Sequence, residues 1–372
     1  MLAIKVPLIG INELKKILME KGILNKDYKI LSENRHGYIP IIMGKEELAK
    51  FPLKSIENEL NEKLRKVKGR NDTKTYTTKI TIEIIEKDLE KLKKNPKSLV
   101  DELKGKLNIH EIEDLKKSFD IIGDVVILEI PENLEKYKNT IGEAALNFTK
   151  RKAIFMKKSA IKGVMRVREI EHIAGENNSQ TLYKEHGIRL KLDLEDVYFS
   201  PRLATERLRV AKEVSEDETI LDMFAGIGPF PILIAKNTKV KIFAVDINTT
   251  AIEYMKENIT LNRLKGEIIP ILGDINEVSY EKFQKKRIKF DRIIMNLPGT
   301  SFKFLGLAIS LIKSGGVIHY YEFSDSYSQA SQRIEKIAND YGMKSKVLAS
   351  RKVKSSSPGM WHIVIDAKIT KK

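Results

Sequence analysis

Residues 220–230 read ILDMFAGIGPF, and this stretch decides the fold. An apolar strand runs into a Gly-x-Gly turn, and an apolar helix begins near Pro231. Glycine lets the backbone bend tightly and come close to a ligand, and proline suits the first turn of a helix. The stretch therefore predicts a strand–turn–helix unit with a ligand at its glycine turn.

The pattern around this unit predicts an α/β fold. From about residue 205, apolar strands alternate with helices, which is typical of a parallel sheet covered on both faces. In such open sheets, ligands bind beyond the carboxyl ends of the strands. The predicted strands are Thr219–Met223, Lys239–Val245, Glu267–Leu272, Phe290–Met295, Gly316–Tyr321 and Trp361–Ile369.

Composition excludes several classes of protein. The chain has 372 residues, a formal net charge of +16 and no cysteine, so it has neither a disulfide scaffold nor a thiolate metal site. It contains no apolar run long enough to span a membrane, and its start lacks a secretory pattern, so we expect a cytoplasmic protein. The lysine- and isoleucine-rich composition fits a thermophilic archaeon, and the positive charge favours a polyanionic partner such as nucleic acid.

The glycine turn favours one class of cofactor. Asp246 follows Gly226 by 20 residues, the spacing at which a carboxylate accepts from ribose hydroxyls. A nicotinamide dinucleotide needs a third glycine where Pro231 stands, and prolines remove the amide donors that a pyrophosphate needs. S-adenosylmethionine has no phosphate. Asp274, at the end of the third strand, could accept from an adenine amino group.

Two further stretches point to a reaction centre. Asn296-Leu297-Pro298 follows the fourth strand, at the sheet edge where ligands bind. Upstream, the turn at Pro201 precedes a helix on which Arg202 and Glu206 share a face. Each stretch taken alone is also compatible with a structural role, as a proline-terminated strand and a surface ion pair.

The chain divides into three predicted domains. Residues 1–66 form a small N-terminal α+β domain, 67–75 a polar linker, 76–195 a middle α+β domain and 196–372 the Rossmann-like domain. In the middle domain the sequence predicts a charged helix over Glu83–Asn95, a strand over Asp120–Pro131 and antiparallel strands within Gln180–Leu194.

These motifs together resemble a known family. The glycine stretch is similar to motif I of class I methyltransferases, and Asn296–Pro298 resembles motif IV of amino-methyltransferases. The whole set resembles the archaeal and eukaryotic tRNA (guanine-N1-)-methyltransferases that modify guanosine 37 beside the anticodon. The other stretches that carry the resemblance are Ala3–Pro7, Asp120–Pro131, Arg166–Glu169, Val197–Arg207 and Ser357–His362.

The resemblance implies a mechanism and a set of site residues. N1 of guanine carries a proton, so methylation needs a base and a group that stabilises charge on O6. By resemblance, Glu206 is the general base, Arg166 the O6 partner, and Asn296 with Pro298 holds the base; Arg168 is the alternative to Arg166. No metal is implied. Tyr198, Arg202 and Arg207 bind the substrate, and S-adenosylmethionine contacts Asp222, Phe224, Ala225, Gly226, Gly228, Asp246, Ile247, Asp274 and Asn296.

The resemblance also implies tRNA as the partner, bound by its body and its anticodon loop. Three basic stretches, 150–162, 285–287 and 344–354, are then phosphate contacts. We expect a monomer, because one chain carries every motif. The alternatives are an enzyme that also methylates a wyosine precursor, a wybutosine-pathway aminocarboxypropyl transferase, and a non-catalytic tRNA-binding protein.

Overall fold

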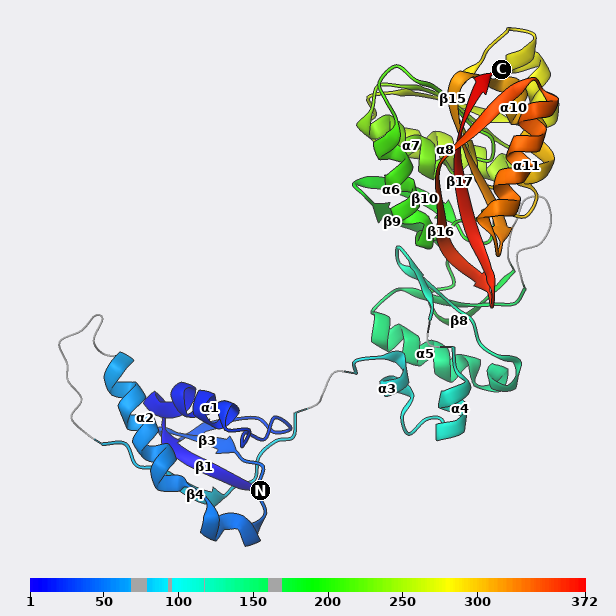
Figure 1. The fold of residues 1–372 in the computed structure, drawn as a ribbon. Helices are drawn as coiled ribbons and strands as arrows, with labels where there is room; N and C mark the ends of the chain where they lie inside the picture. Colours follow the sequence, from blue (N-terminus) through cyan, green and yellow to red (C-terminus); the bar gives the residue numbers. More distant parts are fainter. Residues whose placement is uncertain (68–78, 93–95, 117, 160–168) are drawn as a thin grey trace. The chain divides into compact units, whose positions relative to one another are not determined.

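The computed structural model describes residues 1–67, 79–92, 96–116, 118–159 and 169–372, and these form two units, Met1–Lys97 and Ser98–Lys372. Among the described residues, no helix combines the length and the apolar character needed to cross a membrane. Figure 1 shows the elements of both units in chain order.

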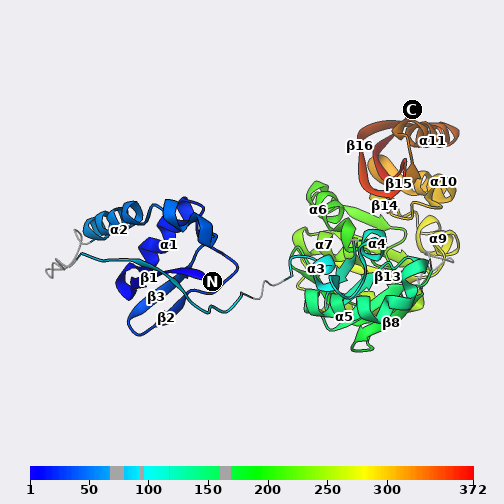
Figure 2. The ribbon, with the colours of Figure 1, turned by 90° about the horizontal axis from the view of Figure 1, so that it is seen from below.

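The first unit is a four-stranded sheet with two helices on it (Figure 2). Pro52 separates a 3-10 turn, Lys45–Lys50, from the helix that follows, Leu53–Val67, since proline cannot continue a helix. The strands, in spatial order β2-β3-β1-β4, are Leu31–Glu33, His36–Pro40, Leu2–Pro7 and Glu83–Glu86; the helices are α1 (Ile11–Glu20) and α2 (Leu53–Val67).

The helix predicted over Glu83–Asn95 is wrong. Glu83–Glu86 is β4, which pairs antiparallel with β1. The physical reason is the alternation of Ile80, Ile82 and Ile84, which all contribute to the core of this unit and so follow the two-residue period of a strand. Residues 79–92 thus lie in the first unit, although the sequence placed 76–195 in the middle domain. Most of the predicted linker lies outside the described residues.

The second unit begins with a four-stranded sheet in the order β5-β6-β7-β8. The single strand predicted over Asp120–Pro131 is a hairpin, because Gly123 takes a positive φ of 57° between β5 and β6. A helix covers one face of this sheet. The elements are α3 (Leu99–Leu103), α4 (Ile109–Asp114), β5 (Asp120–Ile122), β6 (Val125–Leu128), α5 (Lys138–Thr149), β7 (Ala153–Lys157) and β8 (Ile170–Gly175).

The large sheet of the second unit has seven strands in the order β13-β12-β11-β14-β15-β17-β16. The first five are parallel, but β17 runs antiparallel to β15 and to β16, so the alternation did not predict the direction of the last strand. The strands are β11 (Thr219–Asp222), β12 (Lys241–Asp246), β13 (Glu267–Leu272), β14 (Phe290–Met295), β15 (Ile312–Ser324), β16 (Met343–Ser357) and β17 (Met360–Lys371).

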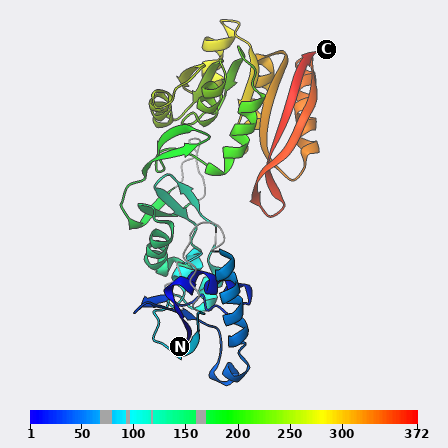
Figure 3. The same ribbon diagram turned by 90° about the vertical axis from the view of Figure 1, so that its left-hand side faces the viewer.

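Strand β16 was not predicted as a strand, because its sequence stands out only by its positive charge. In the structure it forms a long ribbon with β17 at one side of the sheet (Figure 3). An edge strand has one pairing partner and one solvent-facing side, so it needs few apolar residues. Its lysines therefore follow from its place at the edge.

Both faces of the large sheet are covered by helices, as predicted. Along β14, Ile294 packs into one core, while its neighbours Ile293 and Met295 pack into the other. This alternation explains the continuous apolar runs of the strands. The helices are α6 (Ala204–Glu213), α7 (Pro229–Asn237) and α8 (Thr249–Thr260) on one face, and α9 (Ile275–Ser279), α10 (Leu305–Leu311) and α11 (Tyr327–Asp340) on the other.

A hairpin of β9 (Gln180–Glu185) and β10 (Ile188–Asp193) confirms the antiparallel prediction for this stretch. His186 and Gly187 both take positive φ, as the tight two-residue turn requires. Two asparagine side chains, in and just after α8, form the backbone hydrogen bonds that a neighbouring strand would form with β10. The Asn258 amide exchanges hydrogen bonds with the Lys191 backbone at 2.6 and 3.0 Å, and Asn262 does the same with Arg189 at 2.9 and 2.8 Å.

This hairpin is therefore attached to the large α/β domain, although the sequence placed it in the middle domain. A buried ion pair adds to the attachment. Arg207 on α6 donates two hydrogen bonds to Glu185 at the end of β9, at 2.6 and 2.5 Å, and both side chains are at most 3% exposed. A third bond, at 3.2 Å, reaches the Ser200 carbonyl.

We predict that Glu185→Gln destabilises this unit by about 3–5 kcal/mol, because it leaves the Arg207 charge buried without its carboxylate. Urea unfolding measures the effect. The control is Glu281→Gln, which removes the exposed partner of Lys285 and should cost at most about 0.5 kcal/mol. Equal losses in the two variants would contradict the argument.

Candidate active site

A pocket opens at the carboxyl end of the parallel strands, where the topology predicts a ligand. It is built from the segments that follow β11, β12, β13 and β14, closed on one side by the start of α6. Of the residues predicted from the sequence, it is lined by Tyr198, Arg207, Phe224, Ala225, Gly226, Asp246, Ile247, Asp274 and Asn296.

The glycine turn has the geometry that its sequence predicts. Gly226 and Gly228 take positive φ of 54° and 86°, and Gly228 is the N-cap residue directly before α7. A Cβ on Gly228 would lie 2.8 Å from Met255 Cγ, so this glycine permits α7 and α8 to pack closely. Gly228 is not part of the pocket lining; it lies in the turn against Met255 and Ile232.

Asp246 is bound to the glycine turn. Its carboxylate accepts from the Gly226 amide at 2.6 Å and from the Asn248 amide at 2.9 Å. Ile247 beside it keeps 37% of its surface exposed. On the next loop, Asp274 accepts from the Asn276 amide at 2.8 Å, so it caps α9 and lines the pocket at once.

Asp222 lies behind the pocket, fully buried at the end of β11. Burial raises the pKa of this carboxyl to about 8; a hydrogen bond from the Phe224 amide opposes the shift and the nearby charge of Asp246 adds to it. Burial also raises the pKa of Asp246, against hydrogen bonds from backbone amides. A cation brought next to these acids would favour their charged forms.

The pocket therefore fits a nucleoside with a positive charge and no phosphate. Proline occupies the first and third positions of α7, so that helix has lost amide donors that a phosphate would use. The polar side chains lining the pocket include the carboxylates Asp246 and Asp274 and the amides Asn248 and Asn296. The carboxylates can accept from ribose hydroxyls and attract a sulfonium cation, and the amides can both donate to and accept from an adenine edge.

The two predicted arginines near α6 differ in position. Arg207 lines the pocket, but Glu185 holds its guanidinium. Arg202 points elsewhere: its Nε donates to Asp120 of the middle sheet at 2.7 Å, and the side chain is 48% exposed. It is not part of the pocket lining.

Glu206 also stands behind the pocket wall. It lies on α6 between the lining residues Leu203 and Arg207, and its side chain is 6% exposed. Its carboxylate accepts from Arg209 Nε at 3.0 Å and from the Tyr321 hydroxyl at 2.7 Å, with a further bond from the other arm of Arg209. Tyr321 follows Tyr320 on β15, and Tyr320 pairs with Met295, the residue before Asn296.

The turn after β14 joins the pocket to β15. Asn296 and Leu297 line the pocket, whereas Pro298 does not, and the Pro298 carbonyl accepts from the Phe323 amide at 3.2 Å. Phe304, which the sequence analysis missed, closes the same side by packing edge-on against Phe224 at 5.0 Å between ring centroids. Arg166 and its alternative Arg168 lie outside the described residues.

Comparison with known proteins agrees with this geometry. Family models match along the chain: the TRM5/TYW2 methyltransferase domain at residues 181–348, the TYW2 N-terminal domain at 99–178 and the tRNA methyltransferase 5 N-terminal domain at 3–49. The tRNA (guanine(37)-N(1))-methyltransferase Trm5b of Pyrococcus abyssi is 41% identical over 99% of both chains. The chain belongs to the TRM5/TYW2 methyltransferase family.

Solved structures of this family share the fold over the whole chain. The complex of aTrm5 with tRNALeu is similar at a TM-score of 0.81, with 40% identity over 99% of both chains. Methanocaldococcus jannaschii Trm5 in complex with adenosine is similar at a TM-score of 0.64, with 38% identity over 100% of both chains. The three-part architecture predicted from the sequence is confirmed, and the family domain begins at residue 181, within hairpin β9–β10.

We predict that Asp222→Asn flattens the fall in stability between about pH 4 and pH 8. An unfolded Asp ionises near pH 3.9, whereas folded Asp222 keeps its proton up to about pH 8, so stability is lost as pH rises through this window. Asn mimics the protonated form and does not titrate. Unfolding free energies at pH 5 and pH 8 measure the difference, with exposed Asp217→Asn as control; an unchanged slope would contradict the shift.

Proposed function

We propose that this chain is a tRNA (guanine(37)-N1)-methyltransferase that uses S-adenosylmethionine. The observation that carries the proposal is full-length similarity to Trm5b, with 41% identity over 99% of the chain, together with a pocket suited to a cationic nucleoside. The tRNA methyltransferase 5 domain at residues 3–49 favours this function over aminocarboxypropyl transfer.

The pocket residues bind and orient the two reactants. Asp246 would hold the ribose of S-adenosylmethionine, Asp274 the adenine, and Phe224, Ala225, Gly226 and Ile247 would surround the nucleoside. When bound, S-adenosylmethionine supplies an activated methyl group on a sulfonium. Asn296 would hold the edge of guanosine 37, which must leave the anticodon-loop stack to reach it.

Glu206 is our proposed general base for the N1 proton. Its support is position: Glu206 directly precedes the lining residue Arg207 on α6, and its carboxylate accepts from Tyr321 on β15, the strand that pairs with β14 up to the residue before Asn296. Reaching the substrate requires Glu206 to exchange one of its present hydrogen bonds for the N1 proton. Arg166 would stabilise charge on O6, and Tyr198 at the pocket wall would contact the base.

The tRNA would be held by positive charge outside the pocket. On β16, Lys344, Lys346 and Lys352 are exposed along the sheet edge, where phosphates can reach them. We assign tRNA-body binding to the first unit, whose matched family domain carries the tRNA methyltransferase 5 name.

We also propose a cytoplasmic monomer; a dimer mass that does not change with concentration would contradict this.

We predict methyl transfer to an unmodified tRNA carrying guanosine 37 and none to the same tRNA carrying adenosine there. The measurement uses labelled S-adenosylmethionine followed by nucleoside mass analysis. 1-Methylguanosine only in the first tRNA supports the proposal. An aminocarboxypropyl adduct, or binding without product, would replace it by the corresponding alternative.

We predict that Glu206→Gln slows single-turnover methyl transfer by about 10²–10⁴-fold, the range for loss of a general base. Affinity for S-adenosylmethionine should stay unchanged, because Glu206 is not part of the pocket lining. The control is Glu253→Gln on the exposed side of α8, which should leave the rate unchanged. A normal rate in Glu206→Gln would remove it from the base role.

A further inference from the structure

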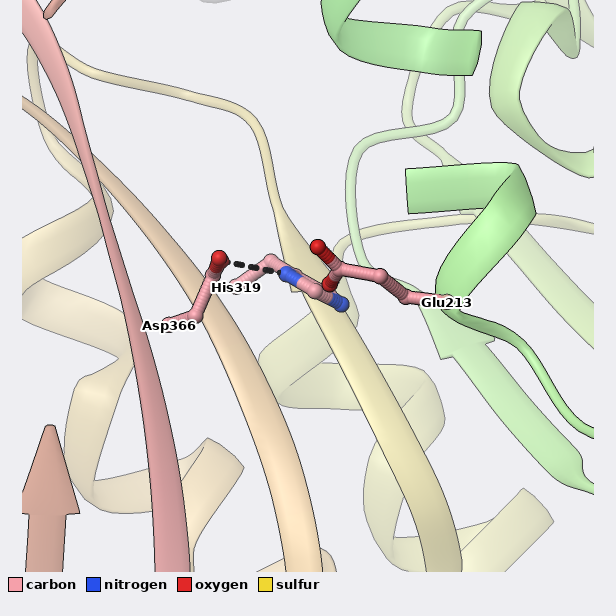
Figure 4. Close-up of side chains that lie close together, drawn as sticks. All are labelled: Glu213, His319 and Asp366. Atoms are coloured by element: carbon pink, nitrogen blue, oxygen red, sulfur yellow. Dashed lines mark hydrogen bonds and ion pairs between the residues drawn. The ribbon is translucent and has the colours of Figure 1, made fainter. Parts of the chain in front are cut away.

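Behind the pocket wall, Glu206 belongs to a buried group of charged and polar side chains whose other members have no role yet in the proposed proton transfer. We call it the Arg209 cluster: Glu206, Arg209 and Glu213 on α6, His319 and Tyr321 on β15, and Asp366 on β17. Figure 4 shows Glu213 and Asp366 on either side of His319. Apart from Glu213, these side chains are largely buried.

Arg209 is the centre of this cluster. Besides its bonds to Glu206, its terminal nitrogens donate to Asp366 at 2.7 and 3.3 Å, and one of them donates to Glu213 at 2.8 Å. One guanidinium is thus shared among three carboxylates. The pKa of Arg209 is raised: burial works against the charged form, and Glu206 and Asp366 outweigh burial.

His319 adds no charge to the cluster. Arg292 Nη1 lies 2.7 Å from His319 Nε2, and a guanidinium can only donate, so Nε2 must be the unprotonated acceptor. Nδ1 then carries the proton and donates to Asp366 at 2.6 Å. Arg292 is fixed in turn by Glu218, at 2.8 and 3.0 Å. His319 is therefore a neutral donor that orients the Asp366 carboxylate.

The same geometry argues against a metal ion here. Glu213, His319 and Asp366 offer ligand atoms within 4.8 Å of one another. However, the Arg209 guanidinium already bonds to both carboxylates, and His319 presents a protonated nitrogen to Asp366. An ion would have to displace an arginine from a site that arginine already fills.

The sharing of Arg209 matters for the proton affinity of Glu206. A carboxylate that receives a guanidinium alone is a weak base, because the ion pair stabilises its charged form. Here Asp366 and Glu213 compete for the same cation, and a further arginine, Arg351 on β16, lies 3.8 Å from Asp366. The Tyr321 hydroxyl, whose pKa burial raises well above its ordinary value, is a neutral donor to Glu206.

We propose that Asp366 is a positioning residue that keeps Glu206 basic by sharing the Arg209 guanidinium with it. The inference rests on the proposed role of Glu206 as general base. In the reaction, the N1–H bond of guanine breaks, an O–H bond forms on Glu206, and the proton later leaves to solvent. Removing the charge of Asp366 concentrates Arg209 on Glu206 and weakens that base.

The test is the pH dependence of the single-turnover rate of the full chain with tRNA and S-adenosylmethionine. For Asp366→Asn we expect the rise of the rate on the acidic side of the pH–rate profile to occur at a pH lower by roughly one unit, because a weaker base loses its proton at lower pH. We also expect the rate on the plateau to fall about three- to tenfold, because a weaker base accepts the N1 proton less readily. The Glu213 side chain is 41% exposed, so Glu213→Gln should change the acidic side of the profile and the plateau rate in the same directions, with smaller changes than Asp366→Asn. Asp291→Asn is the control outside the cluster.

The outcomes separate this inference from the proposed function. Affinity for S-adenosylmethionine shows whether each variant is folded, and Glu213→Gln keeps the test available if Asp366→Asn does not fold. If folded variants react more slowly but the acidic side of their pH–rate profile does not shift, the cluster has only a structural role. That result would overturn this inference and leave the proposed function intact. If Glu206→Gln keeps the normal rate and limb, the base assignment fails first and this inference fails with it.

Discussion

The structure around the active site depends on the burial of two arginine charges on one helix. Arg207 and Arg209 both point into the protein from α6, and a buried guanidinium without a carboxylate would cost several kcal/mol. Arg207 is satisfied by Glu185 of the hairpin, and Arg209 by Asp366 of the last strand. These partners fix the helix between distant parts of the chain, and its position decides which of its residues line the pocket.

A second constraint acts at the carboxyl ends of the parallel strands. Asp246 accepts from the Gly226 amide, so its carboxylate and the glycine turn form one unit. Asp222 lies behind them in a place where its charge is unfavourable, with a pKa raised to about 8 by burial. A sulfonium cofactor would relieve this unfavourable electrostatic environment. The pocket thus combines shape for a nucleoside with a preference for positive charge.

The hairpin β9–β10 connects the middle sheet to the catalytic sheet. On one side, Asn258 and Asn262 satisfy the open edge of β10 with side-chain amides. On the other, the Asp124 amide donates to Thr181 at 2.9 Å, and a Cβ on Gly123 would lie 2.2 Å from the same hydroxyl. The two sheets also share one hydrophobic core. The pocket wall at Arg207 is therefore supported from the middle domain.

The sequence by itself determined the parts of this protein that depend on local pattern. The glycine turn, the parallel strands and Asp246 follow from residue spacing, since strand ends and turns are set by neighbours in the chain. Local pattern was misread where the charges of Glu83–Glu86 masked the isoleucine alternation of a strand.

Only the tertiary structure decided the electrostatics behind the pocket. His319 and Asp366 are 47 residues apart, and Arg209 and Asp366 are 157 apart. No periodicity relates such residues, because their contact depends on the order and direction of β15 and β17. The same packing placed Arg202 beside Asp120 and Glu206 beside Arg209 and Tyr321, contacts that the sequence pattern did not indicate. Local chemistry is encoded along the chain, whereas the partners of a buried charge are chosen by the fold.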